Sequence, residues 1–233
     1  MKTLCALDFE TTGLDRGADE VIEVGLVLWS IPLHRPVRAS GFLVKTSREI
    51  SKEITDITGL TKDLLDLYGI GQEPALNIVL QWIAQADVLC AHNGRDFDRP
   101  FFAQWCKRHN RDVPQRVWID TMRDLSIEGY RLGHMAADAG FLNPFPHMAV
   151  TDVLTMLRLL DSHGVETALQ AAQTPEVALR AVVDFKSNQK AKDRKYRWDP
   201  ERRIWHKTVK ITQLEEEKKA DFEVVVLEES VVK

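Results

Sequence analysis

The chain has 233 residues, of which 44% are hydrophobic and 28% charged, with a formal net charge of −4 at pH 7. These values are ordinary for a globular protein with one good core, or with one domain and a small appendage. The overall charge does not mark the chain as a nucleic-acid or membrane binder, although residues 184–212 carry ten Lys or Arg against four Asp or Glu.

Three cysteines, Cys5, Cys90 and Cys106, are odd in number and have no CxxC spacing, which argues against a disulfide framework or a zinc site. No signal peptide opens the chain, and no apolar run approaches the roughly 20 residues needed to span a bilayer. We therefore expect a cytoplasmic location and no membrane partner.

The first 45 residues predict three strands in succession. Residues 4–10 (LCALDFE) and 20–30 (EVIEVGLVLWS) are apolar and β-rich, and a third strand is expected near residues 40–45, after a loop that carries Pro32 and Pro36. Three successive strands indicate an antiparallel meander at one side of a sheet.

Helices and two further strands then alternate. Apolar residues recur at helical spacing, and short apolar runs end in polar loops. We expect helices at 73–85, 99–108, 131–139 and 149–162, and strands at 87–91 and 116–121. This order predicts an α/β or α+β domain with a mixed sheet.

The last fifty residues form a small appendage in this interpretation. Strand-like runs at 195–198 and 204–209 are joined by DPERR, which is typical of a hairpin turn, and a short helix and a last strand follow. We place the boundary between a main domain, residues 1–180, and an appendage, residues 181–233. Trp198 and Trp205 lie in this basic hairpin, either as packing residues of a solvated face or as a platform for bases.

Two carboxylates, Asp8 and Glu10, end the first strand. Residues two apart on a strand point the same way, so these side chains project together. Like charges this close are hard to ionise unless a cation lies between them. The alternative is a strand that simply runs into a polar turn, which Thr11, Thr12 and Gly13 would also suit.

Further acids and a histidine recur downstream in compatible settings. Asp98 lies where a loop meets a helix, and Asp152 follows His147 at the start of the strongest amphipathic helix. Hard oxygen donors suit Mg²⁺ or Mn²⁺, and two such ions about 4 Å apart can clamp a scissile phosphodiester. A histidine with an ordinary pKa near 6.5 can take a proton from the attacking water.

The segments DFETTG, HN…FDRPFF and HMAVTD resemble the three motifs of the DnaQ-like 3′–5′ exonucleases of the DEDDh type, in the same order, between residues 8 and 152. This superfamily includes polymerase proofreading exonucleases, exonuclease X, RNase T and oligoribonuclease. The resemblance implies a ribonuclease-H-like fold with a five-stranded mixed sheet flanked by helices. It also implies an enzyme that uses two divalent ions and releases nucleoside 5′-monophosphates.

Position by position, the resemblance implies that Asp8, Glu10, Asp98 and Asp152 bind the metal ions and that His147 is the general base. Asp8 would bridge the two ions, Glu10 and Asp152 would hold the ion on the nucleophile side, and Asp98 would support the second ion.

The resemblance also implies contacts with the terminal nucleotide. Thr11, Thr12 and Leu14 would line its pocket, with Leu14 wedged against bases. His92 and Asn93 would either contact substrate or cap the following helix.

The middle motif departs from its commonest spacing. Phe97 is four residues after Asn93 instead of three, and Asp96 is also present. Either Asp96 or Asp98 could therefore be the ligand, and Asp98 is favoured because Phe97, Asp98 and Phe101 preserve the apolar spacing of the motif.

By analogy with the family, the expected substrate is the 3′ end of single-stranded or duplex DNA, in repair or proofreading. The alternatives are an RNA 3′-end exoribonuclease, an exonuclease-fold module that docks to a polymerase or other repair partner, and a non-catalytic nucleic-acid binder. A homo-oligomer is compatible with the sequence.

Overall fold

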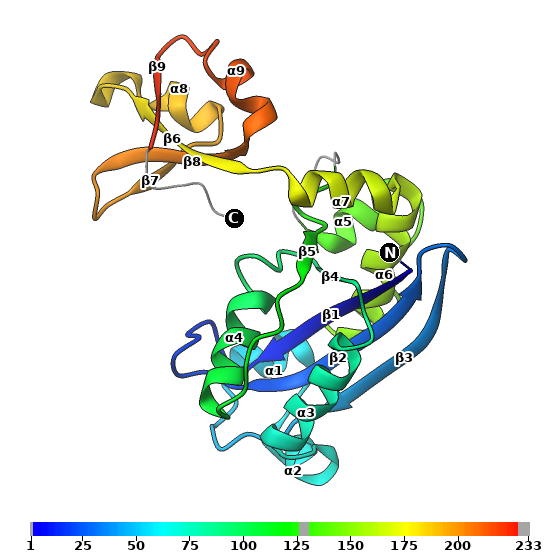
Figure 1. The fold of residues 1–233 in the computed structure, drawn as a ribbon. Helices are drawn as coiled ribbons and strands as arrows, with labels where there is room; N and C mark the ends of the chain where they lie inside the picture. Colours follow the sequence, from blue (N-terminus) through cyan, green and yellow to red (C-terminus); the bar gives the residue numbers. More distant parts are fainter. Residues whose placement is uncertain (1, 126–130, 228–233) are drawn as a thin grey trace. The chain divides into compact units, whose positions relative to one another are not determined.

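Three antiparallel strands at the start of the chain form one side of a five-stranded sheet. In the computed structural model, which describes residues 2–125 and 131–227, these strands are β1 (Thr3–Thr11), β2 (Val21–Ser30) and β3 (Arg35–Leu43). β4 (Val88–Ala91) and β5 (Val117–Asp120) then pair in parallel on the other side of β1, which gives the order β3-β2-β1-β4-β5 (Figure 1). The predicted mixed five-stranded α/β sheet is confirmed.

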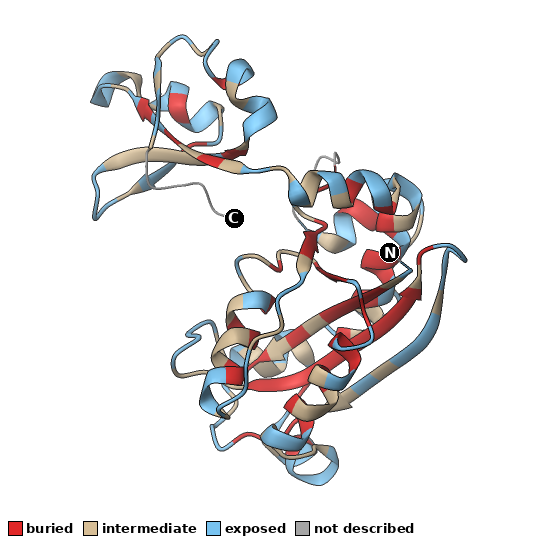
Figure 2. Ribbon diagram, in the orientation of Figure 1, coloured by how far each residue is buried: buried red, intermediate tan, exposed pale blue. Residues whose placement is uncertain are grey.

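Helices cover both faces of this sheet, and its central strands are buried (Figure 2). On one face, Leu7 and Phe9 pack in a cluster with residues of α3 (Gln72–Ile83) and α4 (Asp98–Arg108). On the other face, Leu4 and Ala6 pack with α6 (Ala149–His163). The remaining helices of this part of the chain are α1 (Lys52–Thr58), α2 (Lys62–Tyr68), α5 (Leu132–Asp138) and α7 (Val165–Gln173).

Two glycines allow α6 to begin directly on the sheet. Gly25 of β2 and Gly41 of β3 are partners in the ladder, so their missing side chains leave one shared gap. A Cβ atom on Gly25 would lie 2.6 Å from the backbone nitrogen of Val150, and one on Gly41 would lie 3.2 Å from the Val150 side chain. The first turn of α6 therefore sits beside Asp8, which pairs with Gly25 across β1 and β2.

The chain divides into two compact units, residues 1–172 and 173–233. The second unit contains a four-stranded antiparallel sheet in the order β7-β8-β6-β9, made by β6 (Glu176–Val182), β7 (Arg197–Asp199), β8 (Ile204–Lys210) and β9 (Glu223–Val226). Two helices, α8 (Asn188–Asp193) and α9 (Leu214–Glu217), and two short 3₁₀ turns, η1 (Phe185–Ser187) and η2 (Ile211–Gln213), complete it.

The boundary between the units differs from the one placed at residue 180. That position lies within β6, which pairs with β8 and β9 and therefore belongs to the second unit. The predicted hairpin, helix and last strand are all present there. The three cysteines are free and buried, as expected of small apolar residues. Among the described residues, no helix has the length and apolar character that crossing a membrane requires.

Candidate active site

Asp8 and Glu10 leave β1 on the face that α6 covers. They continue the alternate positions of Leu4 and Ala6, which pack with α6. The β1–β2 register shifts between Glu10 and Thr11, so the strand is irregular directly after the second carboxylate. Irregularities of this kind re-aim side chains and often lie next to active sites.

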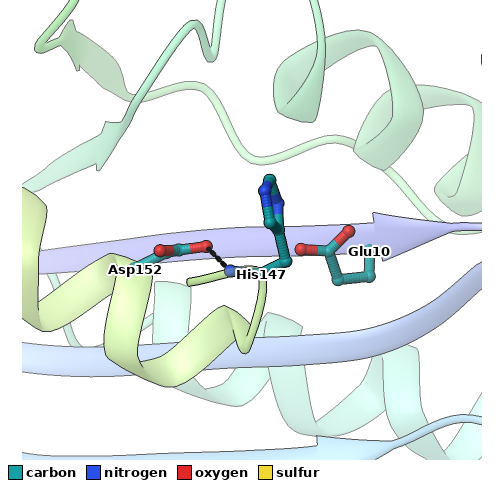
Figure 3. Close-up of side chains that lie close together, drawn as sticks. All are labelled: Glu10, His147 and Asp152. Atoms are coloured by element: carbon teal, nitrogen blue, oxygen red, sulfur yellow. Dashed lines mark hydrogen bonds between the residues drawn. The ribbon is translucent and has the colours of Figure 1, made fainter. Parts of the chain in front are cut away.

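The start of α6 brings His147 and Asp152 to the same place. The Asp152 carboxylate accepts the backbone N–H of His147 at 3.0 Å and the side-chain amide of Asn143, which fixes the loop that enters the helix. One ligand atom each of Glu10, His147 and Asp152 lie within 4.8 Å of one another (Figure 3). His147 has a φ of 61°, a left-handed conformation that His adopts more readily than most residues.

Asp98 reaches the site from the first turn of α4. It is 1% exposed, and its Oδ1 atom accepts the backbone N–H of Phe9, between the two carboxylates of β1, at 3.1 Å. Its Oδ2 atom is buried and has no hydrogen-bond partner among the described residues. Asp96 instead forms an ion pair with Arg123 at 2.5 Å and is half exposed. The structure therefore brings Asp98, and not Asp96, to the carboxylates of β1.

Burial and mutual repulsion raise the pKa values of this cluster. Burial, then the charges of Asp98 and Glu10, raise the pKa of Asp8 well above its usual range. Burial is also the first cause for Glu10, whose pKa is raised to about 8, and for Asp98, likewise raised to about 8. Burial raises the pKa of Asp152 too, against the opposing effect of the His147 amide. Such a cluster favours a cation, which would allow all four groups to ionise.

A fifth carboxylate, Glu23, lies beside the cluster and is not among the residues predicted from the sequence. It lies opposite Glu10 in the β1–β2 ladder and is 5% exposed. The pKa of Glu23 is raised to about 7. Burial is the largest cause, a hydrogen bond from the backbone N–H of Ala149 opposes the rise, and the charge of Asp152 adds to it. The available signal was a lone acid within the apolar run VIEVGLVLW, at a position where a strand between two helical layers should be apolar.

His92 and Asn93 lie in the loop after β4. The ring nitrogen Nδ1 of His92 is 2.9 Å from the Thr121 hydroxyl, and Asn93, with a φ of 59°, donates its backbone N–H to Asp120 at 2.9 Å. Asp120 also accepts the backbone N–H of Arg95. Asp120 therefore has a structural role, because it holds the loop that leads to Asp98. A contact of His92 or Asn93 with substrate stays a prediction.

The predicted nucleotide-binding residues at and after the end of β1 differ in exposure. Thr11 and Thr12 are buried, and their hydroxyls donate to the Gly13 carbonyl and the Asp19 carboxylate at 2.6 and 2.8 Å. Leu14 is 82% exposed, so it is open to contact with a ligand.

A cavity of about 600 Å³ adjoins the carboxylate cluster. None of the five residues predicted to bind the nucleotide lines it. It lies between the β2–β3 ladder, the end of α1 and the loop before α6, and its lining residues include Glu23, Phe42, Leu60, Phe145, His147 and Met148.

The donor set fits a hard divalent cation. The groups that converge are carboxylates, without a thiolate, and the Oδ2 atom of Asp98 is buried and unpaired in the part of the chain that the structure describes. Mg²⁺ and Mn²⁺ prefer such oxygen donors, whereas a structural zinc site would use Cys or His.

Residues 5–160 match a family model described as exonuclease, named RNase T. The chain is 33% identical to the PolC-type DNA polymerase III of Thermotoga maritima over 156 residues, which are 64% of this chain and 11% of the polymerase. It is 27% identical to the 3′–5′ exonuclease DinG of Staphylococcus aureus over 168 residues, 69% of this chain and 18% of that protein. The chain thus spans a small part of the relatives it matches.

Two solved structures share the fold at low identity. Escherichia coli exonuclease I bound to a dA16 oligonucleotide is 14% identical with a TM-score of 0.63, over 78% of this chain and 48% of that one. The nuclease domain of 3′hExo, a DEDDh family member bound to rAMP, is 18% identical with a TM-score of 0.59, over 69% of this chain and 90% of that one. The sheet, the motif order and the family match agree, and the chain belongs to the RNase T exonuclease family.

Proposed function

We propose that the protein is a metal-dependent 3′–5′ exonuclease that removes nucleoside 5′-monophosphates from the 3′ end of DNA. The observation that carries the proposal is the convergence of Asp8, Glu10, Asp98 and Asp152 beside His147. The first two residues come from a strand end, and the others come from two helix starts far apart in the sequence.

In this proposal the four aspartate and glutamate side chains hold two divalent ions, Mg²⁺ or Mn²⁺. Bound there, the ions would activate a water molecule and stabilise the oxygen that leaves the scissile phosphate. The protein contributes a rigid frame: Asp98 is fixed by the amide of Phe9, and Asp152 by the amide of His147.

His147 is the proposed general base. Its side chain is exposed while its backbone is held by Asp152, so the ring lies at the site with access to solvent (Figure 3). A neutral imidazole at this position can take the proton of the attacking water, and general-base catalysis of this kind contributes about 10²- to 10⁴-fold to the rate.

The cavity beside His147 is the proposed site of the terminal nucleotide. Its apolar wall, which includes Phe42 and Phe145, suits the face of a nucleobase or sugar, and Glu23 and His147 are also among its lining residues. Leu14, which is exposed after the end of β1, is the proposed wedge against the neighbouring base.

DNA is the proposed substrate because the curated relatives include a DNA polymerase and DinG. A role in repair or proofreading, and association with a polymerase, are proposals on the same support. RNA is the second candidate, because a structural neighbour was solved with rAMP.

The test is degradation of 5′-labelled oligonucleotides in Mg²⁺ by the wild type, by Asp8→Ala and by Asp66→Ala as a control that removes an exposed aspartate. Shortening from the 3′ end should be lost in Asp8→Ala and retained in Asp66→Ala. Equal rates in all three proteins would remove the catalytic claim. Matched single-stranded DNA, duplex DNA and RNA assign the substrate, and faster digestion of RNA would overturn the choice of DNA.

A further inference from the structure

The sheet of the C-terminal unit has one covered face and one open face. Ala191 of α8 and Leu214 of α9 pack in a cluster with Leu179 of β6 and Val209 of β8, so the helices lie on the face that these two strand residues share. Side chains alternate along a strand. The neighbours of Leu179 and Val209 therefore point to the opposite, open face of the sheet.

Two arginines and a histidine form a row on this open face. Arg180 of β6 is the ladder partner of His206 of β8, and Arg197 of β7 is the partner of the same histidine from the other side. Residues directly opposite one another share a face, and strands lie about 4.8 Å apart, so the two arginines are roughly 10 Å apart across the sheet. Both are exposed.

Most ion pairs of this unit join carboxylates to lysines and do not involve the two arginines of the row. Five lysines of the unit pair with carboxylates: Lys190 with Asp221, Lys207 with Glu217, Lys210 with Glu176, Lys218 with Glu215 and Lys219 with Glu216. Arg180 and Arg197 have no carboxylate partner among residues 2–125 and 131–227.

The acids on the same face do not cancel the row. Glu176 is paired with Lys210, and Asp199 accepts the backbone N–H groups of Glu201 and Arg202 in the turn after β7. Glu223 is the ladder partner of Val182, two positions beyond Arg180 along β6. Glu223 thus leaves one acid on this face beside the row, while Arg180 and Arg197 form no ion pair within the described residues.

We propose that the row Arg180–His206–Arg197 is a second nucleic-acid site, which binds the sugar-phosphate backbone of a single strand. Guanidinium groups form paired hydrogen bonds with phosphate oxygens, and unpaired ones supply the salt-dependent part of such binding. A row that spans only three adjacent strands suits one nucleic-acid strand. The inference rests on the proposed function in one respect: the bound nucleic-acid strand is taken to be the substrate of the exonuclease.

The two tryptophans of the hairpin lie on the other face. Trp198 follows Arg197 and so points the opposite way, and its ring lies 5.6 Å from that of its ladder partner Trp205. Trp205 packs against the buried cluster under the helices, and Lys192 lies over its ring. Base stacking on this pair is therefore outside the proposed site, and Trp198→Ala can test it separately.

The experiment measures binding of the full chain to a fluorescein-labelled 20-nucleotide oligothymidylate by anisotropy, in EDTA, so that no cleavage is required. The double variant Arg180→Ala/Arg197→Ala should bind roughly tenfold more weakly at 0.1 M salt. Its slope of log K against log salt should be smaller by about 1.4, since each phosphate contact on a single strand contributes about 0.7. Both side chains are exposed, so the fold should tolerate the change.

The matched control is Lys218→Ala/Lys219→Ala, which removes two paired lysines directly after α9 and should leave the affinity and slope unchanged. Wild-type binding by the arginine variant, an equal loss in the lysine variant, or an equal loss in Trp198→Ala would each overturn the proposal. If the protein degrades no oligonucleotide but its affinity still depends on Arg180 and Arg197, this site is supported and the proposed function fails.

Discussion

Gly25 lies directly beneath the first turn of α6, where a Cβ atom would be 2.5 Å from the carbonyl oxygen of Ala149. Gly25 is also the ladder partner of Asp8. The absence of one side chain thus allows the start of α6, with His147 before it and Asp152 within it, to approach the carboxylates of β1.

Gly25→Ala should reduce the turnover number strongly while the protein remains folded. The added methyl group meets backbone atoms, which cannot rotate away, so the start of α6 must shift. Overpacking of this kind costs about 1–3 kcal/mol, and a displacement of 1 Å at a catalytic group can cost about 10²-fold in rate. Steady-state kinetics and thermal unfolding measure the two effects.

Gly133→Ala is the matched control, because nothing lies within 4 Å of the added methyl group. It sits in α5, where Ala is favoured over Gly by about 0.5–1 kcal/mol, so stability should rise slightly with no change in rate. Full activity in Gly25→Ala would show that the close approach of α6 is not required.

The Asp96 and Asp98 alternatives can be separated by metal binding. Asp98→Asn keeps an acceptor for the Phe9 amide but removes a charge from the cluster, so the stabilisation by Mg²⁺ should be reduced or lost. In the wild type that stabilisation is about 2.7 kcal/mol at a concentration 100 times the dissociation constant. Asp96→Asn breaks only an ion pair with Arg123 and should keep the effect. Thermal unfolding with and without Mg²⁺ measures the stabilisation in each variant. Loss of the stabilisation in Asp96→Asn, with retention in Asp98→Asn, would make Asp96 the ligand.

Much of the fold was predictable because its signals are local. The helix of residues 149–162 was placed within one residue of α6, since its apolar positions repeat at helical spacing and Gly164 follows it. The third strand was placed five residues too late because Pro36 indicates a loop. The structure accommodates Pro36 because β3 is an edge strand with a register shift nearby.

The parts of the site that escaped prediction depend on contacts between distant segments. The motif order gave the four acids and His147, and the structure brings these residues together. Glu23 was not predicted, because its place beside Glu10 follows from the pairing register of β1 and β2. The role of Gly25 likewise depends on where α6 crosses the sheet, which no spacing in the sequence specifies.

Without divalent cations, stability should fall as the pH rises from about 4 to about 8. Unfolded carboxylates have a pKa near 4, whereas the pKa values of Glu10 and Asp98 in the folded protein are raised to about 8. Between these values the folded state retains protons that the unfolded state has lost, so raising the pH favours unfolding. Thermal unfolding in EDTA between pH 4 and pH 8 measures this dependence of stability on pH. Saturating Mg²⁺, or Asp98→Asn, should flatten the dependence, and stability that rises with pH in EDTA would contradict it.

His147→Gln should lower the turnover number by about 10²- to 10⁴-fold, the usual contribution of a general base. The stabilisation by Mg²⁺ should remain, because the carboxylates are intact. His134→Gln, the same change on the exposed side of α5, should leave both quantities unchanged. Loss of the Mg²⁺ effect in His147→Gln would instead make His147 a metal ligand, which its proximity to Glu10 and Asp152 also allows.

Glu23 should act as a positioning residue between β2 and α6. Its carboxylate receives the backbone N–H of Ala149, so it ties the start of the catalytic helix to the strand beside Glu10. Glu23→Ala should reduce turnover by about 10- to 100-fold, as is common for residues that orient a metal site. Glu23→Gln keeps an acceptor oxygen and should restore most of the rate. Equal losses in the two variants would show that the charge of Glu23, and not its hydrogen bond, is what the site requires.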